Sequence, residues 1–465
     1  MIREVVFCMK EKIFYRQGNA ATGDIIPFFD RGTFYLYYLH DFRDFEHRGE
    51  GIPWYLLKTK NFCSFEECGE AVSRGKPDEQ DLFVFTGSVI KSGDVFHVFY
   101  TGHNPHKDRT RRPMQGVMHA VSRDGVRFEK TGDEILYAPA GYEPDDWRDP
   151  FVFWREDTQK WNMLLAAREE GKPRLRAGCT ALLTSSDLMH WQVEPPFWAP
   201  ESYFTHECPD LFEWNGWWYL IFSEYNDKCR TRYRKAHSLD GPWLCPEDDV
   251  FDGRAYYAAK SVGNGKRRFL TGWIPTKAKD DHSGWDWGGS LAVHELFQKD
   301  NGDLKIAPVK EIEAHWREQV FSMPSAAVDG SERFGVRRLN YPMAESFRLH
   351  CKIRGKGARR FGIVLAYSEA DGNGYTYYFE PGNRRFAFDH IPDEHWCIND
   401  FTSVERTVPD AAEHVLTILV EDEVCVAYVD GAVALCSRMK NRRGNCIALL
   451  ALDGAAEWSD IAVFE

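Results

Sequence analysis

The sequence contains no apolar run long enough to cross a membrane as a helix. Such a span needs about 20 consecutive apolar residues, and the longest apolar stretches of this 465-residue chain are much shorter. The N-terminus also lacks the pattern of a secretory leader, because Arg3, Glu4 and Lys10 surround its short apolar run from Val5 to Met9. We therefore expect no membrane partner and a cytoplasmic location.

The chain has no excess of positive charge. Its 58 Lys and Arg residues are outnumbered by 71 Asp and Glu residues, which gives a formal net charge of −13, and no long basic run is present. Proteins that bind a nucleic acid usually concentrate cations that neutralise phosphates. We therefore expect no nucleic-acid partner.

The cysteines form no recognisable framework. Twelve of them are spread from Cys8 to Cys446 without a CxxC pair, whereas disulfide-rich and zinc-binding domains usually show regular spacing. Cys63 and Cys68 come nearest to a metal pair, but no second Cys/His pair follows at zinc spacing. The 16 histidines show neither an HExxH motif nor a triad-like spacing. We expect reduced thiols, no metal and no organic cofactor.

Long helical periodicity is absent from the first two thirds of the chain, where short runs of Val, Ile, Phe, Tyr and Trp alternate with turn residues. One aromatic-rich run returns five times, about 50 to 65 residues apart, with a shorter apolar strand before it and another strand after it. Such a repeat predicts a β-propeller, because one twisted sheet buries its faces only by stacking on its neighbours. We expect a five-bladed propeller over residues 1–305. A large β-sandwich with accidental spacing is the alternative, and the matched strand types in each unit count against it.

The pattern changes in the last third of the chain. Residues 306–323 form a predicted linker that we expect to be helical. Alternating strands with Asp-Gly turns at Asp371 and Asp430 then occupy residues 324–465. The predicted fold is therefore all-β, a five-bladed propeller followed by a C-terminal β-sandwich.

Three acidic residues begin the first strands of the first, third and fourth repeats: Asp24, Asp149 and Glu207. The innermost strands of a propeller converge on its centre, so these side chains are expected to meet. Glycoside hydrolysis needs a carboxylate on one face of the sugar and a carboxylic acid that protonates the leaving oxygen. Each acid also has a simpler interpretation. Asp24 could be a turn residue, and Asp149 could be a structural ion-pair partner of Arg148. Glu207 could be an acid that merely lines a channel.

At these motifs the chain resembles glycoside hydrolase family 32, the β-fructosidases, as a divergent member. WRDP at Trp147–Pro150 is similar to the family's Arg-Asp-Pro motif, and ECPDLF at Glu207–Phe212 matches its Glu-Cys motif. FTGSV at Phe85–Val89 is similar to its Phe-Ser-Gly-Ser segment, and VAYVDG at Val426–Gly431 looks like part of its second domain. The resemblance covers nearly the whole chain. It implies a retaining hydrolase that cleaves terminal β-fructofuranosyl residues from sucrose, fructooligosaccharides or a related small fructoside.

The resemblance also implies roles for single residues. Asp24 would be the nucleophile, Glu207 the acid/base, and Asp149 the group that stabilises the transition state. For Trp54 and Trp273, a position in the core is as compatible with the sequence as a position that lines the sugar site. For Trp287, the simpler interpretation is that it closes a blade. The residues expected to contact the sugar are Arg148, Trp54, Phe85, Ser88, Trp273 and Trp287.

The nucleophile segment departs from the family pattern. ATGDIIPFF stands where the family has Trp-x-Asn-Asp-Pro-Asn-Gly, and the glutamine usual at the end of the next strand is replaced near Leu39 and His40. Two other functions therefore stay open: an arabinan- or pentoside-active hydrolase of a related five-bladed family, and a non-catalytic carbohydrate-binding propeller. Transfer of fructose to a sugar instead of water would use the same residues. The sequence leaves the oligomeric state unknown.

Overall fold

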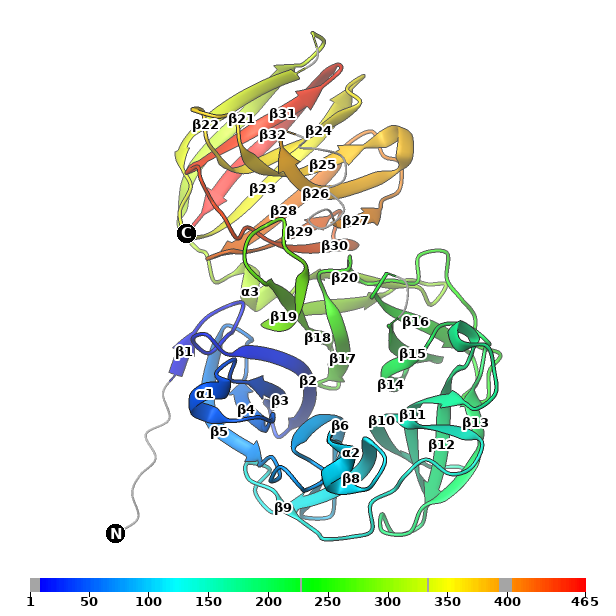
Figure 1. The fold of residues 1–465 in the computed structure, drawn as a ribbon. Coiled ribbons are helices and arrows are strands. Elements are labelled where there is room, and N and C mark those ends of the chain that lie inside the picture. The colour runs from blue at the N-terminus through cyan, green and yellow to red at the C-terminus, as the bar shows by residue number, and fades with distance from the viewer. Residues whose placement is uncertain (1–8, 226–227, 333, 393–403) are drawn as a thin grey trace.

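The computed structural model describes residues 9–225, 228–332, 334–392 and 404–465 (Figure 1). The predicted all-β class is confirmed, because strands form nearly all of the regular structure. The α-helices among the described residues are four-residue segments: α1 (Phe45–Arg48), α2 (Lys107–Thr110) and α3 (Lys310–Glu313).

The strands up to residue 308 are arranged in a ring (Figure 1) and form four antiparallel sheets, of which the largest, with nine strands, joins the first and the last of the five consecutive groups given below. The first two groups are β1 (Met9–Glu11), β2 (Ala21–Asp30), β3 (Thr33–Asp41), β4 (Trp54–Thr59) and β5 (Ser64–Val72), then β6 (Phe83–Ser92), β7 (Val95–His103), β8 (Gln115–Ser122) and β9 (Glu129–Lys130). The others are β10 (Tyr142–Arg155), β11 (Lys160–Glu169), β12 (Gly178–Ser185) and β13 (Gln192–Trp198), then β14 (His206–Trp214), β15 (Trp217–Glu224) and β16 (Thr231–Ala236), then β17 (Tyr257–Gly263), β18 (Arg268–Lys277), β19 (Trp285–Gln298) and β20 (Leu304–Pro308). Pairing of Gly289 in β19 with Thr22 in β2 joins the last group to the first.

Neighbouring groups pack face to face, and consecutive residues of one strand face different neighbours. Val98 of β7 packs with the first group, whereas Phe99 packs with the third. In β11, Leu165 packs with the second group and Leu164 with the fourth. Successive side chains of a strand point to opposite faces, so the long apolar runs in these strands reflect burial on both sides.

One long strand in each group contains a bulge with one extra residue relative to its partner strand: β2, β6, β10, β14 and β17. Such β-bulges turn the strand locally and redirect its side chains. Asp149, Cys208 and Ala258, which lie in three of these bulges, have φ values of 60°, 53° and 53°. The bulges lie between Thr22 and Ile25 in β2, Phe85 and Gly87 in β6, Arg148 and Phe151 in β10, Glu207 and Asp210 in β14, and Tyr257 and Lys260 in β17.

The C-terminal part consists of two six-stranded antiparallel sheets that enclose an apolar core. One sheet contains β21 (Gln319–Asp329), β32 (Ala455–Phe464), β23 (Ser346–Lys356), β28 (His414–Glu421), β29 (Val424–Val429) and β30 (Val433–Arg438). The other contains β22 (Phe334–Pro342), β31 (Cys446–Leu452), β24 (Arg360–Tyr367), β25 (Gly374–Glu380), β26 (Arg385–Ile391) and β27 (Val404–Thr407). Two packed antiparallel sheets of this kind make a β-sandwich.

The predicted helical linker over residues 306–323 was wrong in its extent. β20 continues to Pro308, α3 has only four residues, and β21 already begins at Gln319. Val309, Ile312 and Trp316 are all buried at helical spacing, which is the pattern that favoured a longer helix. The chain instead joins the sandwich early, since Arg317 and Glu318 donate backbone hydrogen bonds to the Glu465 carbonyl.

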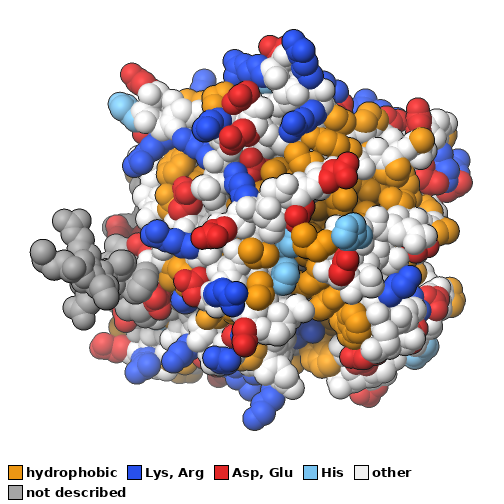
Figure 2. Space-filling model, turned by 90° about the horizontal axis from the view of Figure 1, so that it is seen from below, with side chains coloured by type: hydrophobic (Ala, Val, Ile, Leu, Met, Phe, Trp, Pro, Cys, Tyr) orange, Lys and Arg blue, Asp and Glu red, His pale blue; other side chains and the backbone are white. Residues whose placement is uncertain are grey.

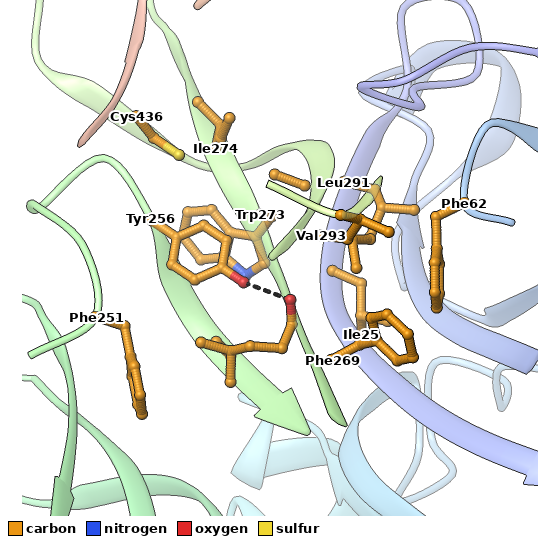
Figure 3. Packing of buried hydrophobic residues seen from close by; sticks show 14 of the residues in the cluster. Ile25, Phe62, Phe251, Tyr256, Phe269, Trp273, Ile274, Leu291, Val293 and Cys436 are labelled. Atoms are coloured by element: carbon orange, nitrogen blue, oxygen red, sulfur yellow. Dashed lines mark hydrogen bonds between the residues drawn. The ribbon is translucent and has the colours of Figure 1, made fainter. Parts of the chain in front are cut away.

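One apolar cluster continues from the ring into the sandwich. Tyr256, Ile274 and Leu291 from the ring belong to the same cluster as Tyr428 and Cys436 from the sandwich. Figure 3 shows Cys436 beside Ile274 and Tyr256, across the boundary between the two parts. The sandwich therefore docks on the fifth group of strands through a buried surface.

The distribution of charged side chains on the surface and the lengths of the helices concern the expected absence of nucleic-acid and membrane partners. Lys, Arg, Asp and Glu side chains are interspersed over the face drawn in Figure 2. Among the described residues, no helix is long and apolar enough to span a membrane.

Candidate active site

Asp24, Asp149 and Glu207 meet around Cys208, although they come from three different groups of strands. The Cys208 N–H donates a hydrogen bond to Asp149 Oδ2 at 2.9 Å, and its thiol lies 3.6 Å from Asp24 Oδ2. Glu207 precedes Cys208 in the chain, on β14. The structure thus brings together the three acids that the sequence singled out.

Asp24 is held by donors on both carboxylate oxygens. The indole N–H of Trp273 donates to Oδ1 at 2.8 Å, and the hydroxyl of Thr86 donates to Oδ2. Burial raises the pKa of Asp24, and the nearby charge of Glu207 adds to the rise, while the hydrogen bonds from Thr86 and Trp273 oppose it. Donors of this kind fix the carboxylate and favour its ionised form, which is the form that attacks as a nucleophile.

An exposed tryptophan covers the residue before Asp24. A Cβ on Gly23 would lie 2.3 Å from the ring of Trp287, so only glycine leaves room for this contact. The Trp287 ring is 39% exposed and meets the Trp273 ring edge-on, with centroids 6.0 Å apart. An aromatic face beside Asp24 is suited to packing against the apolar side of a sugar ring.

Asp149 is 4% exposed and lies in the bulge of β10. Its N–H donates to Thr101 Oγ1 at 2.8 Å, which fixes the backbone at φ 60°. Burial raises the pKa of Asp149 to about 7, with Arg148 opposing the rise and the charges of Glu207 and Asp24 adding to it. This carboxyl group therefore titrates close to neutral pH.

Glu207 has one hydrogen-bond donor for each carboxylate oxygen. Arg148 Nη2 donates to Oε1 at 2.9 Å, and the hydroxyl of Tyr257 donates to Oε2 at 2.6 Å. The Glu207 side chain remains 17% exposed. It is therefore both oriented and open to solvent, as a group that exchanges protons must be.

Arg148 is a cation of the site and is 8% exposed. Besides Glu207, it donates to Asp146 Oδ1 at 2.7 Å and to Gln115 Oε1 at 3.3 Å, and its Nε lies 3.9 Å from Asp149. Arg168 also pairs with Asp146 at 3.1 Å. The site therefore contains more acidic than basic groups, since two guanidinium groups lie among four acids: Asp24, Asp146, Asp149 and Glu207. Such a site favours positive charge that develops on a bound sugar.

One of the predicted sugar contacts, Trp54, is corrected by the structure. Trp54 has no exposed surface and donates its indole N–H to the Phe85 carbonyl at 3.1 Å, so it lies behind the wall of the site. The Oγ of Ser88 accepts the N–H of Val152 at 3.0 Å, which joins β6 to β10, and its contact with a sugar stays a prediction. Phe85 keeps a partly exposed ring, which stacks on His103 with centroids 4.5 Å apart.

Sequence reasoning did not select Thr86, Cys208 or Tyr257. Thr86 and Cys208 lie inside the motifs FTGSV and ECPDLF, but nothing in one sequence shows which motif residue points inward. Tyr257 immediately precedes the bulge in β17, as Glu207 does in β14. Alignment of the first strands of the repeats would have identified its position.

Comparison with known proteins places the chain among sugar hydrolases. The model of the glycosyl hydrolases family 32 N-terminal domain matches residues 26–308, more than half of the chain. A sucrose-6-phosphate hydrolase from Escherichia coli is 26% identical over 422 residues, which cover 85% of this chain and 81% of the relative. A raffinose invertase from Escherichia coli is 29% identical over 387 residues, 76% of this chain and 74% of the relative. An exo-inulinase from Aspergillus awamori has the same fold, with a TM-score of 0.75 at 17% identity over 97% of both chains.

Proposed function

This protein belongs to glycosyl hydrolase family 32, and from that premise we propose that it releases terminal β-fructofuranosyl residues from a small fructoside by a retaining double displacement. The observation that carries the proposal is the meeting of Asp24, Asp149 and Glu207 around Cys208. Similar proteins are named as a sucrose-6-phosphate hydrolase and a raffinose invertase. Sucrose, its 6-phosphate, raffinose and short fructooligosaccharides are therefore the first candidate substrates.

In the first step Asp24 attacks the anomeric carbon of the fructosyl unit. The bond from that carbon to the leaving oxygen breaks, and protonated Glu207 gives its proton to this oxygen. The products are a covalent fructosyl ester on Asp24 and a free alcohol. Trp273 and Thr86 support this role, because they hold both oxygens of Asp24 in place.

In the second step Glu207 acts as a base. Its carboxylate takes a proton from water, the water oxygen attacks the anomeric carbon, and the ester bond to Asp24 breaks. Fructose leaves with the configuration it had in the substrate. The partial exposure of Glu207 supports this step, because it gives water a path to the carboxylate.

Asp149 and Arg148 stabilise the sugar between these steps. As a carboxylate, Asp149 accepts hydrogen bonds from sugar hydroxyls and favours the oxocarbenium-like transition state. Arg148 balances part of the negative charge and orients Glu207. Tyr257 touches Glu207 rather than a substrate, so we assign it as a positioning residue.

A cationic segment next to the site supports a phosphorylated substrate as one of the candidates. Arg109, Arg111 and Arg112 are exposed between β7 and β8. Gln115, at the start of β8, accepts a hydrogen bond from Arg148, so the segment adjoins the site. Guanidinium groups are well suited to bind phosphate.

The same premise extends to the architecture and the location. We propose that the five groups of strands are the blades of a five-bladed propeller, a count that the equivalent bulges, one in each group, support. We also propose that the protein acts in the cytoplasm. The reduced state of its thiols supports this, since no disulfide joins the ten cysteines among the described residues.

Fructose release from a substrate panel tests the proposed activity. The panel contains sucrose, sucrose 6-phosphate, raffinose, kestose and p-nitrophenyl arabinofuranoside. Asp24→Asn and Glu207→Gln should each lower fructose release by about 1,000-fold or more, because each removes a group needed for bond cleavage. Asp30→Asn changes the same side chain at the far end of β2 and should leave release within about twofold. Cleavage of the arabinoside alone would identify a pentosidase, and no turnover of any sugar would identify a binding protein.

A further inference from the structure

A buried Asp, His and Cys converge where the sandwich docks on the ring. Asp252 precedes β17, His294 lies on β19, and Cys436 lies on β30 of the sandwich. Their exposed fractions are 2%, 0% and 0%. None of them takes part in the hydrogen bonds that organise the three catalytic acids, so the cluster is separate from the active site.

The spacing of the donor atoms approaches that of three ligands in a tetrahedral metal site. His294 Nε2 lies 3.5 Å from Asp252 Oδ2 and 3.8 Å from Cys436 Sγ, and all three donor atoms lie within 4.8 Å of one another. Zinc binds nitrogen and oxygen at about 2.0 to 2.1 Å and sulfur at about 2.3 Å, which separates tetrahedral ligand atoms by roughly 3.3 to 3.7 Å. Small shifts would therefore bring the three atoms around one ion.

One carboxylate oxygen of Asp252 lacks a well-placed hydrogen-bond donor. Its Oδ1 accepts backbone hydrogen bonds from Gly253 at 2.5 Å and Cys436 at 2.8 Å. Its Oδ2 is fully buried and has no donor at good hydrogen-bond geometry, because the two side chains that it faces are only loosely placed: His294 Nε2 lies 3.5 Å away, and the Cys436 thiol makes its contact with the same carboxyl group. A buried carboxylate oxygen without a well-placed donor is costly, and a cation between the three side chains would satisfy it.

The surroundings of His294 orient it as a metal ligand. Its Nδ1 lies 2.7 Å from the Tyr428 hydroxyl, which leaves Nε2 to face the cluster. The Tyr256 ring packs edge-on against the imidazole at 4.6 Å. Metal-bound histidines commonly hold their second nitrogen in such a hydrogen bond. Figure 3 shows Tyr256 and Cys436 close together at this boundary.

We propose that Asp252, His294 and Cys436 bind one zinc ion that fastens the sandwich to the ring. The ligand set of one carboxylate, one imidazole and one thiolate suits this borderline-soft divalent cation. Because the three ligands are fully buried, no substrate can reach the ion, and we assign the zinc a structural role instead of a catalytic one. The proposal departs from the expectation of no metal, which rested on local spacing. These ligands are far apart in the sequence and come from two domains.

Cobalt binding to the full-length protein tests the proposal directly. Metal is removed with a chelator under reducing, oxygen-free conditions, and Co²⁺ is then titrated while the absorption spectrum is recorded. We expect one equivalent to bind, with visible bands of a tetrahedral site and a thiolate-to-cobalt band in the near ultraviolet. Zn²⁺ should displace the cobalt, and the protein purified without chelator should contain about one zinc per chain.

Matched cysteine variants locate the ion. Cys436→Ser should lose the thiolate band, whereas Cys425→Ser should keep it, because Cys425 on the adjacent β29 is equally buried but faces the core of the sandwich. Zn²⁺ should raise the melting temperature of the metal-free wild type by about 5 °C or more, and that of Cys436→Ser by much less.

The wild-type measurements decide the proposal even if a variant fails to fold. Absence of stoichiometric cobalt or zinc binding, together with a melting temperature that Zn²⁺ leaves unchanged, would reduce the cluster to hydrogen-bonded side chains and overturn the proposal. Loss of the thiolate band in Cys425→Ser alone would overturn the assigned ligand set. Fructose release is not a readout here, so failure of the proposed activity would leave this test intact.

Discussion

At the scale of single residues, function and stability oppose each other at Asp149. Burial raises its pKa to about 7, although Arg148 opposes the rise. In an unfolded chain an aspartate titrates near pH 4. Between about pH 4 and about pH 7 the folded protein therefore binds more protons than the unfolded chain, so this residue makes the free energy of unfolding fall as the pH rises.

Asp149→Asn should abolish fructose release and raise the melting temperature at pH 8 more than at pH 5. The amide oxygen still accepts the Cys208 N–H, while the buried charge, present at pH 8 and largely absent at pH 5, is removed. Calorimetry at both pH values measures the difference. Asp30→Asn should show no pH-dependent gain. A variant less stable than wild type at pH 8 would contradict the charge cost assigned to Asp149.

A second prediction at the scale of single residues concerns the hydroxyl group of Tyr257. Tyr257→Phe removes the 2.6 Å hydrogen bond to Glu207 and leaves the ring in place. We expect kcat to fall about 10- to 100-fold with KM nearly unchanged, because the hydroxyl positions Glu207, the proposed acid/base, and is not proposed to touch the sugar. Steady-state kinetics on the best substrate of the panel measures both constants.

The neighbouring tyrosine provides the control. Tyr256→Phe removes an equally buried hydroxyl, which donates to the Leu270 carbonyl at 3.0 Å. It should lower the free energy of unfolding by about 1 kcal/mol and leave kcat unchanged. Equal effects of the two variants on kcat would assign Tyr257 to structure alone.

At the scale of strands, the sequence predicted what depends on local pattern. The aromatic-rich runs marked the central strands of the ring, and the three acids were found because each begins a repeat. The face of the sheet on which a side chain lies depends on the strand register and on bulges. In a strand that is apolar on both faces, the sequence pattern indicates neither the register nor the position of a bulge. For this reason Trp54 and Trp273 looked equivalent, although only Trp273 reaches Asp24.

A prediction at the scale of strands concerns the contact between Gly23 on β2 and Trp287 on β19. Gly23→Ala would place a methyl group 2.3 Å from the Trp287 ring and force the ring away from β2. We expect kcat/KM to fall about tenfold or more, through loss of the aromatic wall and movement of the nucleophile. Gly284→Ala, in the loop before β19 where no atom lies within 4 Å of the added group, should have no effect. Wild-type kinetics in Gly23→Ala would show that Trp287 has no part in substrate binding.

At the scale of the whole molecule, the interface between the ring and the sandwich could not be predicted from the sequence. A change from a repeating to a non-repeating pattern marks a boundary in any sequence. Contacts across it join residues more than 100 positions apart, such as Asp252 and Cys436. Arg438 is another case, because it is 2% exposed in the sandwich and donates to the carbonyls of Ile274 and Pro275 in the ring.

Arg438→Met is therefore expected to lower the free energy of unfolding by about 2 to 4 kcal/mol. Methionine replaces part of the buried stem but leaves the two carbonyls, and the Glu423 carboxylate 2.5 Å from the guanidinium, without their donor. Denaturation in urea, followed by tryptophan fluorescence, measures the loss. Arg443→Met is the matched control, since its side chain is 68% exposed and its ion pair spans 3.9 Å, so it should cost at most about 0.5 kcal/mol. Equal losses in the two variants would mean that the buried guanidinium does not hold the sandwich on the ring.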